Sequence, residues 1–76
     1  MRAYRVRPEV IMDEMGKRGW SQQYLAEQSD LPKETISRIL NGHVASPQRR
    51  TLEAIADALD LEVTDIVEAF RPLAVA

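Results

Sequence analysis

Paired carboxylates are the first residues of this chain whose type and spacing could do chemistry. Glu9 and Asp13 lie four residues apart, and Asp57 and Asp60 lie three apart, so each pair would share one face of a helix. Two such groups can serve general acid–base catalysis. However, neither pair has a cysteine, a histidine or a glycine-rich loop as a partner; the chain has no cysteine, and its one histidine is His43. We therefore predict that the chain is not an enzyme and holds no metal and no cofactor.

A second set of candidate residues lies between positions 32 and 40, and its chemistry is hydrogen bonding and charge. On a helix through this segment, the apolar side chains of Ile36, Ile39 and Leu40 share one side. The other side is polar throughout and carries Lys33, Glu34, Ser37 and Arg38. Such a side can contact a polar partner, but a helix that only needs solubility shows the same pattern.

Charge is distributed unevenly along the chain, whose formal net charge is −2. Residues 1–50 hold nine Lys and Arg against six Asp and Glu, a balance of +3. Residues 51–76 hold one arginine against six acidic residues, a balance of −5. This asymmetry indicates one surface that suits an anionic partner and another that is turned away from it.

The elements that must position these residues begin with two short helices. A proline at position 8 suits a first helical turn, and Gly19 is a stop, so a helix is expected over residues 8–18. The hydroxyl of Ser21 can cap the next helix. That helix is expected to break at residues 29–32, where Asp30 tolerates a left-handed conformation.

Three further helices are predicted after this break. The third spans about 32–40 and ends at Asn41-Gly42. Ser46-Pro47 is predicted to open the fourth, with Ser46 as its N-cap. Its apolar residues recur at i, i+3, i+4 and i+7, and they are Leu52, Ile55, Ala56 and Leu59. The fifth is predicted over about 63–70, and its apolar side carries Ile66, Val67 and Phe70.

A chain of 76 residues is expected to form one domain. We predict an all-α, compact five-helix bundle over residues 8–70, with a helix, a tight turn and a second helix at about 21–40. Residues 1–7 alternate like a strand and are predicted to be an arm or short strand, and residues 71–76 form a tail. No apolar run approaches the roughly 20 residues of a membrane span, and the N-terminus does not read as a signal peptide. A soluble, cytoplasmic protein is expected.

In its ordered motifs the chain resembles the lambda repressor and Cro family, also called Xre-like, of helix-turn-helix transcription regulators. The resemblance covers about Pro8 to Phe70. In the helix-turn-helix segment it rests on Gln22, Leu25, Ala26, Ile36, Ser37, Arg38, Ile39 and Asn41-Gly42. It continues in the stretch SPQRRTLEAIADALDLEVTDI, through Thr51, Leu52, Ile55, Ala56, Ala58 and Leu59.

This resemblance implies a sequence-specific, double-stranded DNA-binding repressor whose third helix lies in the major groove. The residues that would read bases are Lys33, Glu34, Ser37 and Arg38. Lysine and arginine can donate to guanine O6 and N7, and glutamate can accept from cytosine N4. The residues that would contact phosphates are Ser21, Gln22, Thr35, Asn41, His43, Arg49 and Arg50.

The chain departs from the family pattern at several positions. Asp30 stands where the family often has glycine, and Pro32 stands where a serine or threonine often caps the third helix. Family members often bury an arginine of the first helix against a glutamate at the end of the third. Those places hold Met15 and Leu40 here, so we expect an apolar contact instead of an ion pair. Trp20 is expected to pack on the core rather than stack on a base.

The resemblance also implies a homodimer on a near-palindromic site. We expect the dimer contact at the C-terminus, through Phe70, Leu73 and Val75, because these apolar side chains have no evident place in a five-helix core. The alternative is residues 1–7, which could pair with their twin or lie along DNA as a basic arm. A different class of function stays open, an antitoxin- or adaptor-like protein-interaction module of the same fold with little DNA binding. In it the third helix would bind a regulatory protein, and the acidic face at residues 53–68 could equally serve a basic partner. No small-molecule ligand or membrane is expected.

Overall fold

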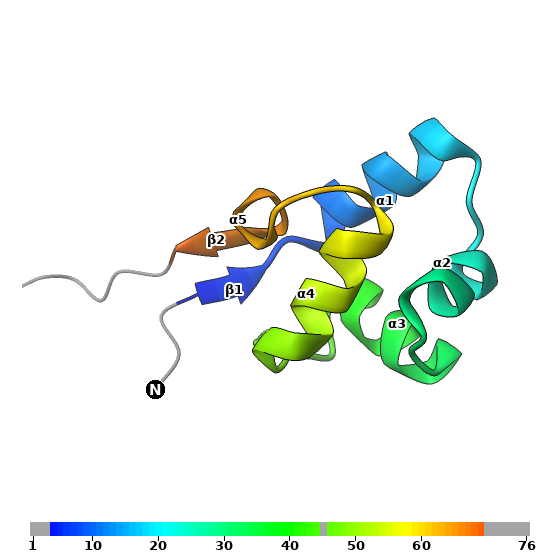
Figure 1. The fold of residues 1–76 in the computed structure, drawn as a ribbon. Helices are drawn as coiled ribbons and strands as arrows, with labels where there is room; N and C mark the ends of the chain where they lie inside the picture. Colours follow the sequence, from blue (N-terminus) through cyan, green and yellow to red (C-terminus); the bar gives the residue numbers. More distant parts are fainter. Residues whose placement is uncertain (1–3, 45, 70–76) are drawn as a thin grey trace, which may run out of the picture.

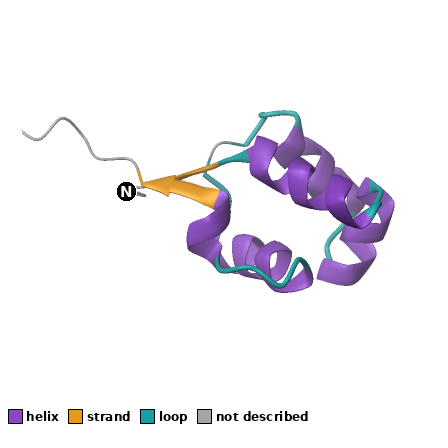
Figure 2. Ribbon diagram, turned by 90° about the horizontal axis from the view of Figure 1, so that it is seen from above, coloured by secondary structure: helices purple, strands orange, loops and turns teal. Residues whose placement is uncertain are grey.

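Five helices form where apolar side chains recur at helical spacing, and the two ends of the described chain pair as strands (Figure 1). The computed structural model describes residues 4–44 and 46–69. In chain order the elements are β1 (Tyr4–Val6), α1 (Pro8–Arg18), α2 (Gln22–Ser29), α3 (Lys33–Leu40), α4 (Arg49–Ala58), α5 (Val63–Ile66) and β2 (Val67–Ala69). The expected all-α bundle is confirmed, with a small antiparallel sheet at one end of the helical body (Figure 2).

The helix ends with the strongest local signals lie where they were predicted. Gly19 ends α1 in a left-handed conformation at φ 69°. The hydroxyl of Ser21 accepts from the Tyr24 amide at 3.1 Å and so caps α2. Asp30 ends α2 at φ 58°, and Pro32 precedes α3 with no side-chain cap bond. The cap bond that the family pattern supplies is therefore absent at this helix.

The start of the fourth helix differs from the prediction. Ser46 was expected as its N-cap, but α4 begins at Arg49 and Gln48 is the N-cap residue, without a side-chain cap bond. The Ser46 hydroxyl donates instead to the Tyr4 carbonyl at 2.9 Å. This bond reaches 42 residues along the chain, which is why the local Ser-Pro signal was misleading.

The predicted fifth helix over residues 63–70 is wrong in its second half. A capping box between Glu62 and Asp65 starts α5, but the helix ends at Ile66 and β2 follows at once. The competing structure is the antiparallel ladder with β1, in which Val6 lies opposite Val67 and the Arg7 amide donates to the Ile66 carbonyl at 2.8 Å. The N-terminal strand thus pairs with its own chain. Phe70 lies outside the described residues.

The core gathers one apolar face from each helix and from β1. Met15 of α1 and Leu40 of α3 are both buried, at 6% and 8% exposure, in this single cluster, and α1 packs against α3. The burial of Met15 and Leu40 in one cluster agrees with the expectation that an apolar contact stands in place of an ion pair. Trp20 is partly buried against the cluster, as predicted, and its ring meets that of Tyr24 edge-on with centroids 4.9 Å apart.

Arg18 joins the end of α1 to the end of α4. Its guanidinium binds the Glu14 carboxylate at 2.7 Å and donates to the Leu59 carbonyl at 2.6 Å. The hydrogen bond from Arg18 also holds the pKa of Glu14 below its usual value. Because Leu59 directly follows α4, the contact satisfies a carbonyl at that helix end. No helix in the described part of the chain is long and apolar enough to cross a membrane.

Candidate nucleic-acid interface

The helix-turn-helix is formed by α2, the turn at residues 30–32 and α3, and the two helices pack against each other. Inside the motif, the buried hydroxyl of Ser29 donates back to the Leu25 carbonyl at 2.7 Å, so this buried polar side chain in the last turn of α2 is paired. Asp30 then reverses the chain in its left-handed conformation. Local hydrogen bonds and a buried apolar face therefore hold the two helices of the motif in place.

The faces of α3 are arranged as the sequence pattern predicted. Its three apolar residues are buried in the core. Lys33, Glu34 and Arg38 are exposed, and Ser37 and Thr35 are partly buried beside them. The Glu34 carboxylate lies in the first turn, where the helix dipole favours a negative charge. The predicted base-reading residues are thus brought together on one accessible helix.

Ion pairing separates the cationic side chains into two groups. Within residues 4–44 and 46–69, five are close to a carboxylate: Arg5, Arg7, Lys17, Arg18 and Arg49. No ion pair forms in this part of the chain at Lys33, Arg38 or Arg50, which lie on α3 and in the first turn of α4. Among the described residues, the Lys and Arg side chains without an ion pair therefore lie on these two helices.

The candidate phosphate-binding residues occupy the ends of three helices. Ser21 and Gln22 stand at the start of α2, where the Ser21 hydroxyl is engaged as the cap. Asn41 follows α3 and donates to the Ser37 hydroxyl at 3.3 Å, and His43 is exposed in the next turn. Arg49 is less available than its neighbour Arg50, because it pairs with Glu53 at 3.1 Å.

A cleft of about 180 Å³ lies between α3 and α4. Its walls come from α3, from the segment between the helices and from α4, and they are formed by Thr35, Arg38, Ile39, Val44, Pro47 and Thr51. Sequence reasoning did not assign Thr51 or Val44 to the site. The one signal that could have found Thr51 was its position directly after Arg49 and Arg50.

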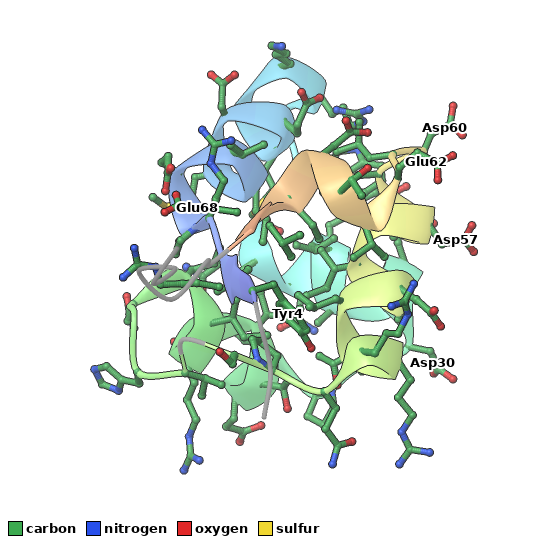
Figure 3. All side chains as sticks on the ribbon, turned by 90° about the vertical axis from the view of Figure 1, so that its left-hand side faces the viewer. Tyr4, Asp30, Asp57, Asp60, Glu62 and Glu68 are labelled. Carbon is green, nitrogen blue, oxygen red and sulfur yellow. The ribbon has the colours of Figure 1, made fainter. Side chains whose placement is uncertain are left out.

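Acidic side chains lie on a different part of the surface. Figure 3 shows Asp57, Asp60 and Glu62 pointing outward along one edge, from α4 and the segment that follows it. We call these three residues the acidic edge. All three are exposed, and none forms an ion pair within the described residues. The acidic edge adjoins the start of α4, because Asp57 and Glu62 line one hollow together with Arg49 and Arg50. The exposed cations of α3, Lys33 and Arg38, do not line this hollow.

One of the two acidic pairs considered for catalysis is held in surface ion pairs. In this pair, Glu9 is 3.5 Å from Arg7 and Asp13 is 3.6 Å from Lys17. Among the described residues, no group of three or more His, Asp or Glu side chains could hold a metal ion. What the surface around α3 can do chemically is donate and accept hydrogen bonds and neutralise an anion.

A comparison with protein families adds an independent finding. A family model described as helix-turn-helix matches residues 11–66, from α1 to the last residue of α5. The match covers more than half of the chain. No curated protein matches the chain.

Proposed function

The chain belongs to the lambda repressor and Cro-like helix-turn-helix family of DNA-binding transcription regulators, and from that premise we propose that it is a sequence-specific repressor. The observation that carries the proposal is the position of its unpaired cations. Lys33, Arg38 and Arg50 have no ion pair within the described residues, and two of them lie on the second helix of the motif. Phosphate neutralisation by such groups dominates affinity for DNA.

In the proposed complex, α3 enters the major groove and its exposed side reads base edges. Lys33 and Arg38 donate to guanine O6 and N7, whereas Glu34 accepts from the N4 amino group of cytosine. Ser37 can either donate or accept. The buried side of α3 supports this role, because Ile36, Ile39 and Leu40 fix the helix on the core.

Phosphate contacts hold the protein in register on the duplex and carry no sequence information directly. We assign them to one residue in the first turn of α3 and to residues at or next to the ends of α2, α3 and α4. These residues are Ser21, Gln22, Thr35, Asn41, His43, Arg49 and Arg50. Arg50 is expected to contribute more than Arg49, since Arg49 must first leave Glu53.

One such domain reads few base pairs, so we propose that the protein acts as a homodimer on a near-palindromic site and represses by occupying it. The proposed dimer contact is C-terminal, through Phe70, Leu73 and Val75. These residues lie outside the described part of the chain and directly follow β2. The N-terminal alternative stays the second candidate, because β1 pairs with β2 along only one of its two edges.

Deleting residues 71–76 is expected to abolish the dimer in analytical ultracentrifugation. Binding to a full palindrome should weaken, because two linked half-sites bind more tightly than one. Binding to an isolated half-site should change little, which makes the half-site the internal control. A truncated protein that still sediments as a dimer would contradict the C-terminal contact.

The acidic edge is the observation that favours the second candidate, a protein-interaction module of the same fold. Asp57, Asp60 and Glu62 would suit a basic regulatory partner. Electrophoretic retention of mixed promoter DNA at low salt separates the two functions. A DNA-binding regulator retards the DNA, and retention falls steeply with added salt. A module that binds only protein leaves the DNA unretarded.

A further inference from the structure

Tyr4 connects the N-terminal strand to the segment that leads into α4. Its hydroxyl donates to the Pro47 carbonyl at 2.8 Å, and its own carbonyl accepts from the Ser46 hydroxyl at 2.9 Å. The two bonds join positions that are 43 and 42 residues apart in the sequence. Tyr4 is partly buried against the core, and Figure 3 views it from the end of the molecule that carries β1. We call this pair of bonds the Tyr4 clamp.

The segment between α3 and α4 is held differently at its two ends. At its start, the Gly42 and His43 amides donate to the Ile39 and Arg38 carbonyls, at 3.2 and 2.9 Å, so α3 itself fixes this end. At its other end, the N-cap residue Gln48 makes no side-chain cap bond. The Tyr4 clamp acts at the two residues directly before Gln48. The Tyr4 clamp therefore restrains the start of α4 from a distant part of the chain, where Gln48 provides no side-chain cap bond of its own.

The first turn of α4 carries groups that the proposed function uses. Arg49 and Arg50 are its first two residues, and Thr51 and Pro47 line the cleft beside Arg38. A long cationic side chain binds a phosphate well only if its backbone is held at the right distance from the duplex. The residue that fixes the start of α4 therefore affects how well these groups bind.

We propose that Tyr4 is a positioning residue for DNA binding, which acts by fixing the first turn of α4 through Ser46 and Pro47. This inference rests on the proposed function of Arg49 and Arg50 as phosphate contacts. Tyr4 itself does not touch DNA in this account. Because Tyr4 also lies opposite Ala69 in the sheet, the pairing of β1 with β2 and the position of α4 depend on each other.

The test is Tyr4→Phe, which removes the hydroxyl and keeps the ring that packs on the core. Binding is measured by fluorescence anisotropy at a temperature where circular dichroism shows every variant folded. Tyr4→Phe is expected to weaken binding about three- to tenfold, the size of one lost hydrogen bond. The loss should be equal on preferred and random sequences. The slope of the logarithm of the binding constant against the logarithm of the salt concentration should fall by up to about one, which corresponds to one phosphate contact.

The matched control is Tyr24→Phe, because Tyr24 is exposed and its hydroxyl has no hydrogen bond within the described residues. Its binding should equal that of the wild type. Ser46→Ala, which opens the clamp from the other side, should weaken binding in the same uniform way as Tyr4→Phe. A loss confined to the preferred sequence would overturn the proposal.

A double-mutant cycle distinguishes positioning from general stabilisation. If Tyr4 acts through the first turn of α4, Tyr4→Phe should weaken binding less than twofold in a protein that already carries Arg49→Ala and Arg50→Ala. A full three- to tenfold loss in that background would overturn the proposal, and so would unchanged binding by Tyr4→Phe alone. If the wild-type protein does not bind DNA at all, the proposed function fails first.

Discussion

Replacing Leu40 with alanine is expected to lower the free energy of unfolding by about 2–5 kcal/mol. Leu40 is buried in the cluster that joins α1 to α3, and truncation would remove apolar contacts and leave a cavity. The loss matters in a chain of 76 residues, because small domains bury a smaller share of their surface and are marginally stable. Urea denaturation followed by circular dichroism measures the change.

Met12→Ala is the matched control for this truncation, because Met12 lies on α1 but is 49% exposed. It should change the stability by less than about 0.5 kcal/mol. Combining Leu40→Ala with Met15→Ala tests the contact itself. Residues in contact give non-additive losses, whereas strict additivity would contradict the expectation that an apolar contact between Met15 and Leu40 replaces the ion pair.

Arg38→Ala is expected to cost about 1–3 kcal/mol of binding free energy at the preferred site and to relax specificity at one base position. The side chain is exposed on α3 and has no ion pair within the described residues. Its loss should therefore act on DNA recognition and leave the fold intact. Competition binding with a set of single-base variants of the preferred site measures both effects.

Arg50→Ala serves as the comparison, because Arg50 is also unpaired within residues 4–44 and 46–69 but is assigned to phosphate. It should weaken binding to all sequences alike. The slope of the logarithm of the binding constant against the logarithm of the salt concentration should become shallower by about one. If Arg38→Ala instead causes equal losses on preferred and random DNA, Arg38 is a phosphate contact and its assignment to a base is wrong.

Local chemistry decided which parts of the fold could be predicted from the sequence. Gly19, Ser21 and Asp30 end or begin helices through their own backbone freedom or side-chain bonds, so their positions follow from neighbouring residues alone. The start of α4 and the end of α5 did not follow. Both places contact Tyr4–Val6 from far along the chain: β2 pairs with this strand, and Ser46 and Pro47 hydrogen-bond to Tyr4. No local sequence pattern can anticipate such contacts.

The same distinction applies to the candidate site. The exposed side of α3 could be predicted, because helical periodicity separates its polar and apolar residues. The sequence did not distinguish the adjacent Arg49 and Arg50, which differ because Arg49 binds Glu53 one helical turn away. Tyr4 was predicted only as part of an arm or short strand, since the role proposed for it depends on two hydrogen bonds across the fold.

Selection of bound fragments from a random pool of double-stranded DNA tests the central claim most directly. A sequence-specific regulator that reads the major groove through α3 should enrich a near-palindromic site. Its half-sites should lie about one helical turn, or 10 base pairs, apart, because the two copies of α3 would meet the same face of the duplex. Retention without any enriched sequence, or no retention at low salt, would contradict the account.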